Sequence, residues 1–139
     1  MASEVQICNL ALAKIGDQQI ISLTENSKAA RLCNLVYEPM RDAVLRSHPW
    51  NFAVKRETLA LDSTAPAYEY TSRFALPVDF LRLLKTNMVD TAAFVLEGQY
   101  ILCDADTLII KYIRQETDPE TFDQLFIETL AARIAAELA

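Results

Sequence analysis

Hydrophobic residues recur at helical spacing near the beginning of the chain, in residues 3–15. At 100° per residue, five apolar side chains fall on one side of this segment: Val5, Cys8, Ala11, Leu12 and Ile15. Ser3 and Gln6 have the spacing of a capping box, and Gly16 follows the last apolar position. The pattern predicts a short amphipathic helix over residues 3–15.

The strongest helical signal covers residues 27–47. Its apolar face consists of Ala29, Leu32, Cys33, Val36, Tyr37, Met40, Ala43 and Val44. Charged and polar side chains dominate the other side, yet Leu35 and Leu45 also fall toward it. Either a sheet or loop covers these two leucines, or they contact a neighbouring subunit.

A third helical pattern occupies residues 119–138, where Asp118 is the expected N-cap and Pro119 the first helical position. Its apolar stripe consists of Phe126, Ile127, Leu130, Ile134 and Leu138. The pattern reaches the last residue without a stop signal. We therefore expect the natural chain to continue beyond this point.

Between these helices, residues 52–113 change to a period of two. Phe52, Val54 and Arg56 fall on one side of an extended chain and the residues between them on the other, and turn residues follow at Glu97–Gly98 and at 104–106. The spacing predicts an antiparallel meander of four to six short strands. The fold class expected is α+β: one domain over residues 1–139, in which the N-terminal helix pair and the C-terminal helix pack with this meander.

The stretch "RSHPWNF" contains the chain's one tryptophan and one histidine, at the change from helical to strand period. Pro49 ends the helical pattern, because the residue before a proline disfavours the α conformation. His48 has no Ser, Cys or carboxylate partner at a recognisable spacing. We expect a structural role for both, with Trp50 filling the space between the helical and sheet layers.

The composition excludes several classes of function. A net charge of −6 and a pI near 4.7 argue against a nucleic-acid-binding face, which needs clustered Lys and Arg. Two glycines are too few for a phosphate-binding loop, and no apolar run approaches the roughly 20 residues of a membrane helix. Cys8, Cys33 and Cys103 lie far apart and are expected to be buried, reduced thiols.

Candidate chemistry is sparse. Asp104 and Asp106 form a DxD pair that could bind a metal, although acidic turns between strands are common. Glu57, Asp79 and Glu97 could act as bases, but no spacing pairs them with a nucleophile. The aromatic and cationic segment 68–74 could stack on bases, but core and strand pairing are expected to use it: Tyr68, Tyr70, Arg73 and Phe74. We expect no enzyme activity, no metal and no cofactor.

Taken together, the motifs resemble the tail tubular protein A-like head-to-tail connectors of short-tailed phages and prophages. An "IG…I.SL.E" start in "KIGDQQIISLTE" is followed by a helix with Tyr37 and Arg41, then by "WNFAVKR" and "YEYTSRFALPVD". An Ala-rich helix after "YIRQETDPETFDQ" completes the order. The resemblance covers nearly the whole chain.

This resemblance implies a non-enzymatic adaptor that forms a ring, twelvefold in characterised relatives, between the portal and the tail nozzle protein. DNA would pass through without sequence-specific recognition, and the protein would reside at the virion's head–tail junction after assembly in the bacterial cytoplasm. No membrane contact is implied. The motif positions that would hold the protomer's shape are Gly16, Trp50, Phe52, Arg56, Tyr70, Pro77 and Asp79.

Ring formation by head-to-tail contact requires two different complementary patches on each subunit. One candidate patch lies on the charged face of the 27–47 helix: Arg31, Leu35, Glu38, Arg41, Asp42 and Leu45. An ordinary solvated helix face remains the alternative there. Two other functions stay open: a monomeric module that binds a peptide or small ligand in a sheet groove, and a metal-dependent hydrolase built on Asp104 and Asp106.

Overall fold

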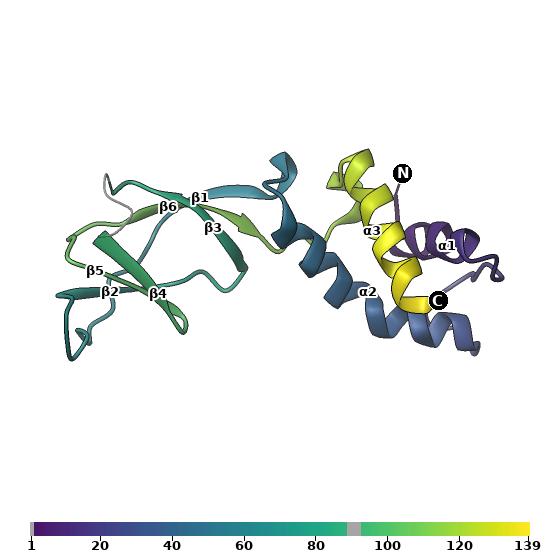
Figure 1. Cartoon of the computed structure of the whole chain (residues 1–139), viewed down its shortest axis with the longest axis horizontal. Helices are drawn as coiled ribbons and strands as arrows, with labels where there is room; N and C mark the ends of the chain where they lie inside the picture. Colours follow the sequence, from purple (N-terminus) through teal and green to yellow (C-terminus); the bar gives the residue numbers. More distant parts are fainter. Residues whose placement is uncertain (1, 89–92) are drawn as a thin grey trace. The chain divides into compact units, whose positions relative to one another are not determined.

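The computed structural model describes residues 2–88 and 93–139, which divide into two compact units (Figure 1). A helical unit is formed by residues 1–53 and 115–139, and a β unit by residues 54–114. The β unit is thus inserted between the second and third helices of the helical unit. The sequence predicts one domain over residues 1–139; the structure has two compact units, each with buried side chains of its own.

The first helix, α1 (Glu4–Lys14), begins and ends as its sequence predicts. The Ser3 hydroxyl accepts a hydrogen bond from a backbone N–H of the first turn at 3.1 Å. At the other end Gly16 has a φ of +74°, and the Asp17 N–H donates to the Leu12 carbonyl at 2.9 Å. This left-handed ending satisfies the last carbonyls of the helix and favours glycine.

The second helix, α2 (Lys28–Ser47), is also found where the pattern places it, with Ser27 as N-cap. The third helix is shorter than predicted. Asp118 caps a 3-10 turn (η3, Pro119–Thr121), and α3 (Gln124–Leu138) begins only after Asp123, whose carboxylate accepts from the Leu125 N–H at 2.9 Å. The prediction of Asp118 as the helix cap was wrong because Phe122 is buried with an extended backbone, which interrupts the helix.

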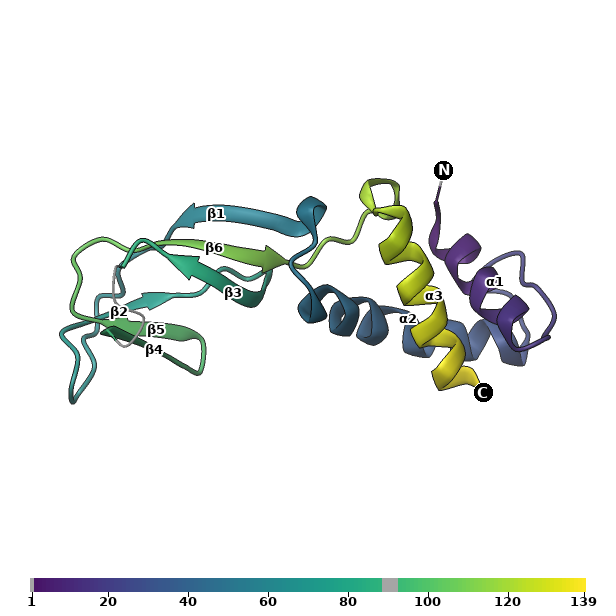
Figure 2. The ribbon, with the colours of Figure 1, turned by 45° about the horizontal axis from the view of Figure 1, so that its top comes forward.

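Within the helical unit, α3 packs against both α1 and α2 (Figures 1 and 2). The largest buried side chains come from all three helices: Ile7, Leu12, Tyr37, Leu45, Phe126 and Leu130. Alanines of α3 share this core, since Ala131 is fully buried and Ala135 nearly so. None of the helices in the described ranges is long and apolar enough to cross a bilayer.

The β unit consists of two three-stranded antiparallel sheets. After a 3-10 turn (η1, Asn51–Ala53), the first sheet has the order β1-β6-β3, and the second has the order β2-β5-β4. The strands are β1 (Val54–Thr58), β2 (Ser72–Ala75), β3 (Phe80–Thr86), β4 (Phe94–Glu97), β5 (Tyr100–Cys103) and β6 (Ile109–Arg114). The α+β class and the antiparallel pairing are confirmed.

The strand order is not that of a meander. Only β4 and β5 are both consecutive and paired, through a two-residue loop in which Gly98 has a φ of +60°. β6, the last strand, lies between β1 and β3. Alternation identifies strands but not their partners, which explains this error. The strand expected from Phe52 begins at Val54, because η1 precedes it, and positions 91–92 of another expected strand lie outside the described residues.

The core of the β unit contains side chains from both sheets. Phe74 of β2 and Ile101 of β5 are buried in the same cluster as Ile110 and Tyr112 of β6. Leu59, in the segment after β1, belongs to it as well. Hydrophobic contact between the two sheets therefore stabilises this unit, as in other layered β structures.

Candidate functional site

The α2 surface proposed for subunit contact is divided by the structure. Arg31, Leu35 and Glu38 are exposed, with 69% of the Leu35 surface accessible. Leu45, by contrast, is fully buried. Of the two leucines on the polar side of the helix, Leu45 is thus covered, and Leu35 remains open to solvent.

Arg41 and Asp42 also belong to the packed part of the helical unit. Arg41 is only 3% exposed, and its Nε donates to Asp42 Oδ1 at 3.0 Å. The other carboxylate oxygen accepts from Gln115 Nε2 at 2.9 Å, which links α2 to the segment before α3. The expectation that these residues lie on a surface patch is corrected for the buried Arg41 and Leu45. The prediction placed these two residues on the solvent side of the helix because it used only helical period and charge.

Trp50 ties the end of α2 to α3. Its indole Nε1 donates to the Val44 carbonyl at 2.9 Å, which satisfies a carbonyl of the last turn of α2. Its ring packs edge-on against Phe126 at 5.1 Å between centroids, and against His48 at 4.8 Å. Phe52 lies beside it, 6.2 Å away between ring centroids, and packs edge-on against Phe126 at 5.0 Å. These ring partners all belong to the helical unit. A structural role for Trp50 is therefore supported, but its ring packs helix against helix instead of filling the predicted space between helical and sheet layers.

In the β unit, Asp79 anchors a turn to the sheet. The hydroxyl of the buried Tyr112 donates to Asp79 Oδ1 at 2.8 Å, and Lys55 lies 3.9 Å from the other oxygen. Burial raises the pKa of Tyr112, and the Asp79 and Glu57 carboxylates raise it further. Pro77 begins this turn by accepting from a backbone N–H at 3.1 Å. Sequence analysis named Asp79 and Pro77 but had no signal that would identify Tyr112 as the partner.

Among the described residues, no side-chain partner of this kind anchors the two remaining motif positions of the β unit. Arg56 is exposed on β1, and Tyr70 is half-buried in the segment before β2. The Tyr70 N–H donates to the Tyr68 carbonyl at 3.0 Å, within a tight bend where Glu69 has a φ of +74°. The structure thus gives a structural role to five of the motif positions and a less clear one to Arg56 and Tyr70. The five are Gly16, Trp50, Phe52, Pro77 and Asp79.

A groove of about 500 Å³ lies on the β2-β5-β4 sheet, beside the aromatic segment 68–74. Arg73 forms an ion pair with Asp62 and lies over the Tyr100 ring, 4.2 Å from its centroid. Tyr68 is 78% exposed, whereas Phe74 is buried. The four residues of this segment therefore do not form one continuous stacking surface, although the groove itself is open.

The acidic turn after β5 is structural. Asp104 Oδ1 accepts from the Thr71 N–H at 2.9 Å, which connects this turn to the residue before β2. Within residues 2–88 and 93–139, no three His, Cys, Asp or Glu side chains gather closely enough to hold a metal ion. In the described part of the chain, the Asp104 and Asp106 pair therefore has no third side chain of these four types beside it.

The cysteines are free and buried, as the sequence predicted. Cys8 of α1 and Cys33 of α2 interact, and burial raises the pKa of both thiols. Cys103 belongs to the core of the β unit. Because a buried thiol with a raised pKa is a poor nucleophile, Cys8 and Cys33 are suited to packing rather than catalysis.

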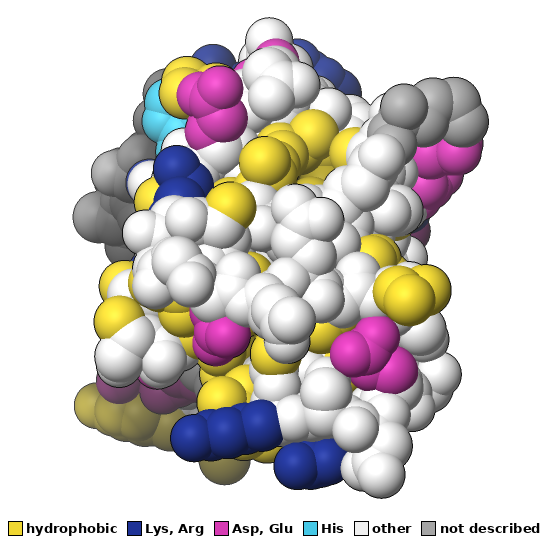
Figure 3. All heavy atoms as spheres, turned by 90° about the vertical axis from the view of Figure 1, so that its right-hand side faces the viewer, with side chains coloured by type: hydrophobic (Ala, Val, Ile, Leu, Met, Phe, Trp, Pro, Cys, Tyr) yellow, Lys and Arg dark blue, Asp and Glu magenta, His cyan; other side chains and the backbone are white. Residues whose placement is uncertain are grey.

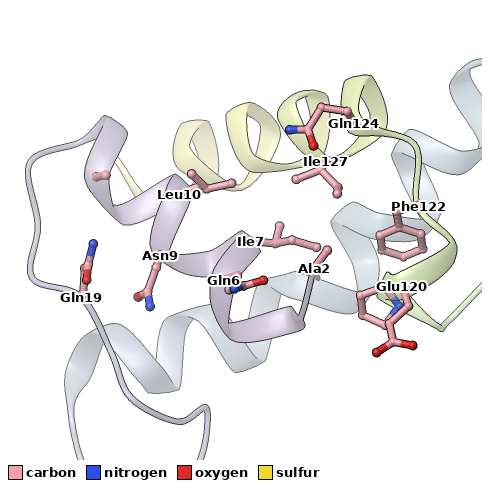
Figure 4. Close-up of a pocket in the computed structure, with 12 residues that line it drawn as sticks. Ala2, Gln6, Ile7, Asn9, Leu10, Gln19, Glu120, Phe122, Gln124 and Ile127 are labelled. Carbon is pink, nitrogen blue, oxygen red and sulfur yellow. The ribbon is translucent and has the colours of Figure 1, made fainter.

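A second groove, of about 640 Å³, runs between α1 and the segment that leads into α3 (Figure 4). Ile7, Phe122 and Ile127 supply apolar lining, and amide side chains border it. Asn9, also on its wall, holds the chain after α1 by donating to the Ile20 carbonyl and accepting from its N–H. On the face drawn in Figure 3, hydrophobic side chains likewise show at the surface, among backbone and other side chains drawn in white.

This groove was not anticipated, because it joins segments more than 100 residues apart. Its described lining includes one charged side chain, that of Glu120. A partly apolar hollow with a single carboxylate suits a hydrophobic side chain or a peptide better than a highly charged small molecule. Neither a protein-family model nor a curated protein sequence was found to match the chain.

Proposed function

We propose that this chain is a structural subunit of a phage or prophage head-to-tail connector, which assembles as a ring between the portal and the tail nozzle. The observation that carries the proposal is the place of the residues on which the resemblance rests. Gly16 ends α1, Trp50 and Phe52 join α2 to α3, and Asp79 holds a turn in the β unit. These roles are structural, which supports a motif that maintains the shape of the protomer rather than one that performs chemistry.

Exposed aliphatic side chains give further support. Leu35 on α2 and Leu125 on α3 are 69% and 61% exposed in the helical unit, and Val78 is fully exposed in the β unit. A subunit that makes head-to-tail contacts needs two unlike surfaces, and both units offer exposed aliphatic groups. The enzyme alternative built on Asp104 has no comparable support, since Asp104 is engaged by the Thr71 N–H.

The experiment that tests the proposal is negative-stain microscopy of the full chain, alone and mixed with the portal ring of the same genome. We expect rings, or an added layer on the portal. Leu35→Glu should weaken this assembly, because it places a charge on an exposed aliphatic position of the expected interface. Ile21→Glu, at another highly exposed aliphatic residue outside α2, is the matched control. Monomers that leave the portal undecorated would contradict the proposal.

The groove on the β2-β5-β4 sheet favours a second candidate, a monomeric module that binds a peptide or small ligand. Tyr68, Tyr70 and Tyr100 line it together with Arg73. Tyrosine side chains supply large amphipathic contacts at low cost in conformational entropy. Saturable binding of a peptide library member, lost in Tyr100→Ala while the chain stays monomeric, would favour this module over the connector.

A further inference from the structure

Charge is distributed unevenly between the two units. The helical unit carries 11 acidic and 6 basic residues, whereas the β unit carries 8 and 7. Six of those seven basic residues lie on the strands of the β1-β6-β3 sheet, where Glu57 is the one acidic residue. An acidic protein thus has one strongly basic sheet.

Three of these cations are directly opposite one another. Arg56 of β1 pairs with Lys111 of β6, and Lys111 pairs with Lys85 of β3. Directly opposite side chains share one face of a sheet, with Cβ atoms about 5 Å apart. The neighbours of Lys111 on β6, Ile110 and Tyr112, point into the β core, so the three cations lie on the other face. We call Arg56, Lys111 and Lys85 the cationic row.

The cationic row is unfavourable for the isolated chain. Like charges directly opposite one another destabilise a sheet. None of the three forms an ion pair or a side-chain hydrogen bond with the described part of the chain. A local rule that is broken without compensation in the fold typically marks a functional surface. An anionic surface on a partner would supply the compensation that the described chain lacks.

The same chain carries a complementary surface. Residues 116–128, which lead into α3 and include its first residues, contain five carboxylates and no cation, and we call them the acidic segment. Asp118, Glu120, Asp123 and Glu128 are exposed there. Leu125 is 61% exposed among them, and Ile109, two residues before Lys111 on the same face of β6, is 42% exposed. Each charged surface therefore includes an exposed aliphatic side chain.

We propose that the cationic row of one copy docks against the acidic segment of a second copy. The inference rests on the proposed connector function, since it adds to the exposed Leu35 position of α2 a pair of unlike, complementary patches such as a head-to-tail ring requires. Opposite charge would select and orient the partner, and the two aliphatic side chains would be buried at its centre. Duplex DNA is a poorer fit, because three cations neutralise few phosphates and the net charge of −6 repels it.

Sedimentation velocity of the full chain tests this contact. Self-association of the wild type should weaken markedly between about 50 mM and 500 mM salt, since screening shortens the reach of exposed charges. The variants Lys85→Glu/Lys111→Glu and Glu120→Lys/Glu128→Lys should each associate at least about tenfold more weakly than wild type. An equimolar mixture of the two should assemble again, because each reversed surface then faces its complement.

The control Lys14→Glu/Lys28→Glu changes two exposed cations of the helical unit and should associate like the wild type. Thermal unfolding adds a second readout. Lys111→Glu places a carboxylate between Arg56 and Lys85, so its melting temperature should rise while its self-association falls. A general folding defect would lower both, so the opposite signs separate loss of the contact from loss of structure.

The outcomes also separate this inference from the connector proposal. Rings, free or on the portal, that form equally well with either reversed variant overturn the docking inference and leave the connector standing. A wild type that stays monomeric, both free and with the portal, overturns both. Binding of a short DNA duplex by a monomeric chain, lost in Lys85→Glu/Lys111→Glu, would assign the cationic row to phosphate and overturn docking between copies.

Discussion

The helical unit and the β unit are stabilised in different ways. In the helical unit, a side chain just before each α-helix supplies its N-cap, and the aromatic rings of Trp50, Phe52 and Phe126 join the elements. The β unit depends on long-range pairing, in which Val54 of the first strand lies opposite Ile113 of the last. A helix is therefore specified by its own residues, whereas a strand of this unit depends on partners that are distant in sequence.

The units also differ in how they treat buried polar groups. Tyr112 in the β unit donates its hydroxyl hydrogen to a carboxylate, whereas the hydroxyl of Tyr37 in the helical unit is buried without a partner in the described chain. Similar side chains thus contribute differently to the two units. Substitutions can break or sharpen this contrast, and their expected effects on stability decrease from Trp50 to the two glycines.

Trp50→Ala should break the aromatic joint of the helical unit. Truncation of a buried aromatic ring typically lowers the free energy of unfolding by about 3–5 kcal/mol. Urea unfolding followed by circular dichroism measures the loss. Trp50→Phe, which keeps a ring but removes the donor to the Val44 carbonyl, should cost only about 1–2 kcal/mol. A loss under about 1 kcal/mol for Trp50→Ala would show that the ring is not part of the core.

Residue-resolved amide exchange of the same variant sharpens the comparison. If the units unfold separately, amides of β5 and β6 should keep their wild-type protection while those of α2 and α3 exchange faster.

Asp42→Ala should disturb the polar link within the helical unit. It removes the partner of the buried Arg41 guanidinium and an acceptor of Gln115. Since the Asp42 side chain is 29% exposed, we expect a loss of about 2 kcal/mol, below the value for a fully buried pair. Chemical denaturation measures it. Glu137→Ala, in the exposed pair with Arg133, is the control and should cost under about 0.5 kcal/mol.

The same substitution at two tyrosines should have opposite signs in the two units. Tyr112→Phe loses the 2.8 Å hydrogen bond to Asp79, so the free energy of unfolding should fall by about 1–2 kcal/mol. Tyr37→Phe removes a buried hydroxyl that lacks a partner within the described residues, so stability should stay level or rise by up to about 1 kcal/mol. Equal losses for both would remove the contrast between the units.

Alkaline pH tests the same pair. Burial raises the pKa of both tyrosines in the folded chain above the ordinary value of about 10. Their contribution is therefore complete below pH 10 and decreases as pH rises above it, because the unfolded chain releases these protons first. From about pH 9 to 11, the wild type should lose more stability than Tyr112→Phe or Tyr37→Phe. Parallel curves would contradict the raised pKa values.

Two glycines with positive φ, one in each unit, give the smallest expected change in stability. Gly16 ends α1 at +74°, and Gly98 forms the β4–β5 loop at +60°. A Cβ at either position would meet no atom within 4 Å, so alanine adds only backbone strain. Each alanine substitution should lower the free energy of unfolding by about 1 kcal/mol, and asparagine at Gly16 should lower it by less. A much larger loss at either site would indicate a contact beyond backbone conformation.

The sequence alone determined the elements that depend on nearby residues. Ser3 and Gly16 marked the ends of the first helix because caps act within one turn, and Gly98 marked a hairpin because its loop requires a positive φ. The buried cysteines and the α+β class also followed from local pattern and composition. The expected interface on α2 was only half right as a surface, since period cannot tell which polar-side residues another element will cover.

Tertiary structure alone decided the strand order, the partner of Asp79 and the burial of Arg41 and Leu45. It also placed Arg56, Lys111 and Lys85 in one row. Each of these depends on register between segments that are distant in the chain, and a period of two is unchanged when the partner changes. Local chemistry therefore fixed what each segment becomes, and long-range packing fixed which side chains meet.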